Sequence, residues 1–104
     1  MAVELRLEPS PPRAGETAIV LTLTDASGAP LEGAHVRVEG NMNHAGMVPE
    51  FAEASETVPG RYEGRLDFTM AGDWFLIVTV RTADGREIER VLDVPGVARA
   101  GKDG

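Results

Sequence analysis

The alternation of apolar and polar residues along this chain constrains its fold more than any other feature of the sequence. Val3, Leu5 and Leu7 alternate with charged residues, and Val36 and Val38 do the same further along. A period of two is typical of β-strands that bury one face and expose the other. Because no segment of the sequence shows a sustained helical period, we predict a fold made of strands.

About seven short strands follow from this pattern, at turn spacings of roughly 8–12 residues. Turn signals separate them, and Asp84-Gly85 is the strongest hairpin signal. This organisation favours an all-β, immunoglobulin-like antiparallel β-sandwich. We predict a single domain over residues 1–95 and a flexible tail over residues 96–104. The strands are expected at residues 3–8, 19–23, 35–39, 51–58, 62–68, 74–82 and 88–94, with 51–58 the weakest.

Composition and charge narrow the classes of function. A chain of 104 residues has the length of one domain. Its net charge of −7 argues against nucleic acid and against an anionic membrane surface as partners. The absence of cysteine excludes disulfides, thiolate zinc sites, iron–sulfur clusters and cysteine nucleophiles. The sequence has neither a signal peptide nor a membrane-spanning run, so we expect a cytosolic protein or a processed form whose leader or anchor was removed.

The candidate metal ligands lie in the predicted loop over residues 40–50, which contains Met42, His44 and Met47. Methionine gains little in a solvated loop, whereas its neutral, polarizable thioether suits Cu(I) better than Zn(II), Ca(II) or Mg(II). In an extended chain Met42 and His44 point the same way. Gly46 can turn the backbone so that Met47 faces the same point. The pattern therefore predicts a Cu(I) site with two thioethers and one imidazole.

A fourth ligand is predicted from the order of the strands. If consecutive strands run antiparallel, the loops after the first, third and fifth strands lie at one end of the sandwich. Met70 follows the fifth strand, so we expect it near the three candidates in the longer loop. Trp74 is expected to shield this site, and its ring would add a cation–π interaction of roughly 0.5–2 kcal/mol.

A structural interpretation of the same residues stays open. Met42 and Met47 would then be apolar plugs that hold a long loop over the open end of the sandwich. In that interpretation His44 is a solvated loop residue and Met70 belongs to the core. His35 lies on a strand face opposite Val36 and Val38, which favours a surface position over a ligand role.

Five segments of the chain carry a recognisable combination of motifs: Gly15-Glu16-Thr17, the segment from Leu23 to Val36, the segment from Met42 to Met47, Gly60-Arg61-Tyr62-Glu63-Gly64, and the segment from Phe68 to Trp74. In these segments the sequence resembles the YtkA-like and FixH-like domains, which are extracytoplasmic β-sandwich modules linked to copper handling and respiratory oxidase assembly. The resemblance covers about residues 9–94. It implies a periplasmic or otherwise exported setting. It also implies a copper-donor or copper-acceptor protein as partner, such as a cytochrome oxidase subunit, and it is compatible with an anchor upstream of the chain.

Two functions of different classes therefore compete. The first is a monomeric Cu(I)-binding protein for storage, delivery or tolerance, with Met42, His44, Met47 and Met70 as ligands. The second is a structural module that docks on a membrane oxidase or transporter without metal. We do not expect an enzyme, because two histidines outside any nucleophile signature give a hydrolytic triad little support.

Overall fold

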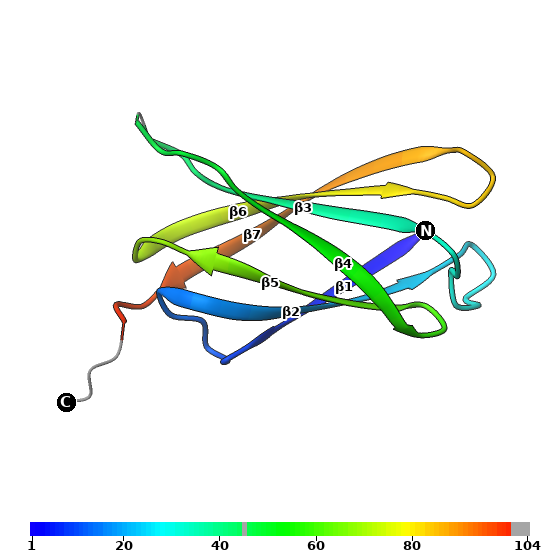
Figure 1. The fold of residues 1–104 in the computed structure, drawn as a ribbon, viewed down its shortest axis with the longest axis horizontal. Helices are drawn as coiled ribbons and strands as arrows, with labels where there is room; N and C mark the ends of the chain where they lie inside the picture. The colour runs from blue at the N-terminus through cyan, green and yellow to red at the C-terminus, as the bar shows by residue number, and fades with distance from the viewer. Residues whose placement is uncertain (45, 101–104) are drawn as a thin grey trace.

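The computed structural model describes residues 1–44 and 46–100, which form an all-β, immunoglobulin-like sandwich of antiparallel strands (Figure 1). The fold class predicted from the alternation is thus confirmed. Within this part of the chain, no helix has the length and hydrophobicity of a membrane span. The strands are β1 (Ala2–Glu8), β2 (Gly15–Thr24), β3 (His35–Met42), β4 (Glu50–Val58), β5 (Arg61–Phe68), β6 (Gly72–Arg81) and β7 (Glu87–Val97).

The strands are hydrogen-bonded in the order β1-β2-β5-β4-β3-β6-β7. β4, predicted as the weakest strand, is the one that joins the two halves of the sandwich. Its residues 50–54 pair with β3, and its residues 55–58 pair with β5. In Figure 1, β4 runs diagonally across the front between the other strands. The sandwich is therefore closed along one side by β4, and its two edge strands are β1 and β7.

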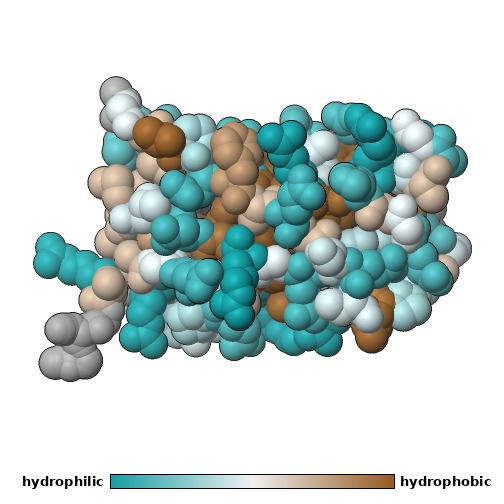
Figure 2. Space-filling view, viewed as in Figure 1, coloured by the Kyte–Doolittle hydropathy of each residue, from teal (hydrophilic) through white to brown (hydrophobic). Residues whose placement is uncertain are grey.

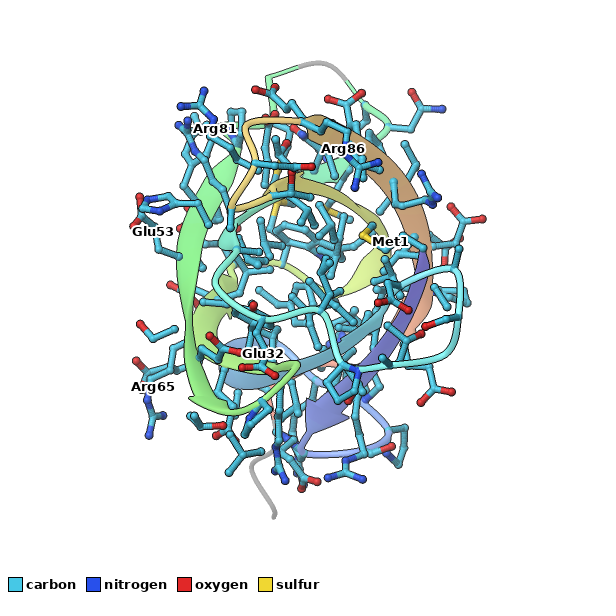
Figure 3. The ribbon with its side chains drawn as sticks, turned by 90° about the vertical axis from the view of Figure 1, so that its right-hand side faces the viewer. Met1, Glu32, Glu53, Arg65, Arg81 and Arg86 are labelled. Atoms are coloured by element: carbon cyan, nitrogen blue, oxygen red, sulfur yellow. The ribbon has the colours of Figure 1, made fainter. Side chains whose placement is uncertain are left out.

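The core lies between the two layers and consists of the inward-facing residues of every strand. Phe68 and Trp74 meet edge to face, with ring centroids 4.9 Å apart. Seen along the long axis, the strands surround a centre filled with side chains, while Glu53 and Arg65 project outward (Figure 3). The buried set contains the predicted inward residues, among them Leu7, Ile19, Leu21, Leu23, Val36, Val38, Tyr62, Leu66 and Phe68.

β3 is longer than the pattern predicts, and β6 begins earlier. Beyond Val38 the ladder continues, with Gly40 opposite Leu76 and Met42 opposite Trp74. The predicted loop over residues 40–50 therefore shortens to residues 43–49. Since the partner strand decides where pairing stops, the sequence alone placed this boundary too early. Met42 is the last residue of a strand and not a loop residue.

β7 also runs further than expected, through Pro95 to Val97. One extra residue bulges out of β7 near this point, because Gly72 pairs with Val97 while Trp74 pairs with Val94. A proline is tolerated in an edge strand or at a bulge, where its missing N–H breaks no ladder bond. The tail predicted over residues 96–104 thus overlaps the end of β7 at residues 96 and 97. Its residues 101–104 lie outside the described part of the chain.

We expect acid to destabilise the fold partly through Glu56. Its carboxylate accepts hydrogen bonds from the amides of Gly60 (3.0 Å) and Gly33 (3.1 Å). These bonds, that of Gly60 above all, hold the pKa of Glu56 below its usual 4.5. The carboxylate therefore stabilises the fold above about pH 4.5, and this contribution is lost as the pH falls through the folded-state pKa. The free energy of unfolding, measured with urea, should therefore fall less for Glu56→Gln than for the wild type when the pH is lowered from neutral to below about 4.5. Equal losses would contradict this role.

Candidate functional site

The β3–β4 loop (residues 43–49) and the β5–β6 turn (residues 69–71) lie at the same end of the sandwich. This follows from the register, because the last residue of β3, Met42, sits opposite Trp74 near the start of β6. The expectation that these two connections share one end is therefore confirmed. We call this end the rim, defined by residues 42–44, 46–49 and 69–71 together with Trp74. It lies on the left in Figure 1, opposite the N-terminus.

Met42 touches the β5–β6 side of the rim directly. It continues the inward-facing series of β3 and packs half-buried against the core. Its methyl carbon lies over Gly72, so close that a Cβ at Gly72 would stand 2.7 Å from it. Gly72 also has a φ of 129°, which side chains rarely adopt. Glycine at this position therefore lets the Met42 thioether rest against the turn that carries Met70.

Met47 and His44 occupy different environments within the β3–β4 loop. Met47 is half-buried and packs against the core, whereas His44 is exposed. Between them, Gly46 adopts a φ of 83°, as its predicted turning role requires. Figure 2 shows hydrophobic residues at the surface beside this loop, at the upper left of the molecule. The loop thus combines an anchored thioether with an imidazole that solvent reaches.

Met70 lies on the surface, with 46% of its area exposed, so the alternative that it belongs to the core is wrong. Its backbone is nevertheless held in place. The indole N–H of Trp74 donates a hydrogen bond to the carbonyl oxygen of Met70 at 2.8 Å. Trp74 is almost fully buried, so its hydrogen bond ties the turn to the core. Met70 therefore presents its thioether from a turn that is anchored to the core.

The donor types at the rim suit a soft, singly charged ion. Thioethers and an imidazole match Cu(I), and the carboxylate of Asp73 next to the turn adds negative potential that favours a cation. Asp73 is held by the amide of Gly96, which donates to its Oδ1 at 2.8 Å. Across residues 1–44 and 46–100, no three His, Asp or Glu side chains gather closely enough to hold a metal ion. His35 lies exposed on the outer face of β3, at the surface position that was predicted.

Two features of the rim were not found by sequence reasoning. One is the contact of Met42 with Gly72, because a glycine in a predicted turn does not reveal which side chain will cover it. The other is a shallow groove beside the rim, on the outer side of β6 and β7. Nothing in the local pattern joins its lining residues, which are Asn43, Asp73, Trp74, Phe75, Asp93 and Pro95.

The fold defines the class of protein: an immunoglobulin-like β-sandwich whose rim carries methionines from two connections. The family model described as YtkA-like matches residues 1–79. This match spans well over half of the chain, and the chain belongs to the YtkA-like family.

Comparison with solved structures supports the fold. A structure of murine CRIg aligns with 97% of this chain and 100% of that chain, with a TM-score of 0.51 and 17% sequence identity. At this identity the likeness concerns the fold alone. A search of curated protein sequences finds no significant match.

Proposed function

We propose that this chain binds one Cu(I) ion at the rim and exchanges it with another protein outside the cytoplasm. The proposed ligands are Met42, His44, Met47 and Met70. The observation that carries the proposal is the packing of the Met42 methyl group on Gly72. That contact places the Met42 side chain beside Gly72, two residues after Met70, and this proximity supports a shared soft-ion site.

The burial of the four side chains favours exchange over permanent storage. Met42 and Met47 are half-buried and anchored on the core, whereas His44 and Met70 are exposed. An incoming protein ligand would therefore reach the ion from the side of His44 and Met70. Thioethers carry no proton that competes with the metal, while imidazole binds only in its neutral form.

A metal-free interaction module remains the second candidate, and a specific observation favours it. Met42 and Met47 both pack against the core, as apolar plugs of the sandwich end would. Under this proposal the rim docks on a membrane oxidase or transporter subunit and gains nothing from copper. A Cu(I) titration separates the two functions, because the plug role requires apolar bulk and not sulfur.

The decisive experiment is an anaerobic Cu(I) titration against a competing chelator, followed by NMR of the methionine methyl groups. We expect one Cu(I) per chain and shifts at the rim methionines. Met42→Leu, Met47→Leu and Met70→Leu keep the apolar bulk and remove only sulfur. Each should weaken binding about tenfold or more, because even residues that merely support metal ligands change affinity by about 10–100-fold.

The chain offers a matched control for each ligand type. Met1 is a thioether at the opposite end of the sandwich, and His35 is an imidazole on an outer strand face. Met1→Leu, made behind a cleavable tag, and His35→Gln should bind Cu(I) as the wild type does. His44→Gln should weaken binding. If the rim variants bind as tightly as these controls, the proposed ligand set is wrong.

A further inference from the structure

We propose that the outer face of β4, β3, β6 and β7 is a docking surface for a protein with an apolar patch bordered by lysine and arginine. We call this surface the acidic face. It is distinct from the rim, although the two adjoin. The proposal goes beyond metal binding and holds whether or not the rim takes up copper.

An apolar row crosses the acidic face. In the register, Phe51 of β4 lies opposite Glu39 of β3, and Glu39 lies opposite Ile77 of β6. Ile77 in turn lies opposite Val91 of β7. Phe51 and Val91 are 54% and 61% exposed, which is unusual for side chains of this size. With strands about 4.8 Å apart, the row spans about 15 Å.

Carboxylates surround and interrupt this row. Glu39 lies within it, and Glu53, Glu89 and Asp93 flank it on β4 and β7. In the described residues, no ion pair within 4.0 Å involves any of these four side chains. One cation of this face, Arg37, lies opposite Glu53 in the register and sits over the ring of Phe51 at 5.2 Å from its centroid. The face therefore offers negative charge that the chain itself does not neutralise.

The opposite outer face, on β1, β2 and β5, lacks this combination. Its acids are interleaved with arginines, and two of them are paired. Arg61 contacts Glu63 at 2.8 Å, and Arg65 contacts Glu16 at 3.6 Å. On β1, β2 and β5 the largest outward apolar side chain, Val20, is only 8% exposed. The exposed Val58 lies at the end of β4, opposite Arg61 of β5. Among the described residues, the acidic face thus joins two exposed apolar side chains, Phe51 and Val91, to uncompensated charge.

Charge decides which occupant fits. A second copy of this chain would place its own carboxylates against the carboxylates of the acidic face. The net charge of −7 on each copy opposes such pairing. A partner with lysine and arginine around an apolar centre would neutralise the border and cover the row. The groove at Asn43, Phe75 and Pro95 extends this surface to the rim. If the proposed function also holds, a docked partner would lie beside the copper ligands.

The test is an NMR titration of the metal-free chain with a short synthetic peptide that alternates leucine and arginine. A second peptide alternates serine and arginine and carries the same charge. We expect the leucine peptide to shift amides of Ile77, Val91 and their neighbours, and to bind more weakly at high salt. The serine peptide should bind at least about tenfold more weakly, because it cannot cover the apolar row.

Two variants with the same new charge sharpen the result. Val91→Asp places a carboxylate in the row, and Thr22→Asp places one on the opposite outer face. Val91→Asp should weaken binding about tenfold, whereas Thr22→Asp should leave it unchanged. Shifts on the opposite face, equal binding of both peptides or no saturable binding would each overturn the proposal. A different result would also overturn the proposal: the wild type sediments as a dimer and Val91→Asp sediments as a monomer. The occupant of the acidic face would then be a second copy of the chain.

Discussion

Replacing Gly64 with valine is expected to lower the free energy of unfolding by about 3 kcal/mol or more. Valine is normally a better strand residue than glycine, by up to about 1 kcal/mol. A loss of stability on Gly64→Val would therefore oppose the strand propensity of valine, and it would report a steric contact at this position. In a domain of this size it would lower the thermal midpoint by about 12 °C or more.

The reason lies in how β4 crosses between the two layers. A Cβ at Gly64 would stand 2.5 Å from the carbonyl oxygen of Glu53 and 3.3 Å from the Cα of Ala54. These are backbone atoms at the point where β4 leaves β3 and begins to pair with β5. A flexible side chain could move aside, but a hydrogen-bonded strand cannot do so without breaking its pairing.

Arg65→Val is the matched control, because it places the same residue one position further along β5, on the outer face. It breaks only the exposed contact with Glu16, so stability should stay within about 0.5 kcal/mol of the wild type. Thermal unfolding followed by circular dichroism compares the two variants. If Gly64→Val is as stable as Arg65→Val, the passage of β4 between the two layers does not require a residue without a Cβ at position 64.

The same crossing shows what the sequence could and could not predict about the fold. Alternation identified the inward faces, because burial follows the period of two along each strand. It identified the existence of β4 but not its double pairing, which depends on Gly64 and on small residues such as Ala52 and Ala54. Strand ends were misplaced for a related reason. Met42 and Pro95 both lie in strands because neighbouring strands continue beside them.

For the candidate site, the sequence predicted the elements better than the contacts. Strand counting placed Met70 at the same end as the loop after β3, which the register confirms. The packing of Met42 on Gly72 and the hydrogen bond from Trp74 to Met70 join residues through space. No periodicity encodes such pairs. Trp74 was expected to shield the site from solvent, which stays a prediction, whereas its hydrogen bond to the backbone of the turn was not expected.

Replacing Trp74 with alanine is expected to cost about 3–5 kcal/mol of folding stability, as for other large buried aromatic residues. The side chain is almost fully buried, contacts Phe68 edge to face and lies against Gly40. Its removal leaves a cavity directly beneath the rim. Calorimetry or circular dichroism should show the loss, and a cost below about 1 kcal/mol would mean that the rim collapses to fill the space.

Trp74→Phe separates packing from the hydrogen bond. Phenylalanine keeps most of the apolar contact but cannot donate to the Met70 carbonyl, so we expect a loss of about 1–2 kcal/mol, close to that of one hydrogen bond. The turn would also be released from the core. If Met70 binds Cu(I), the variant should bind the ion more weakly than the wild type while still folding. Lower stability with unchanged Cu(I) affinity would show that Trp74 supports the sandwich and does not position Met70 for the ion.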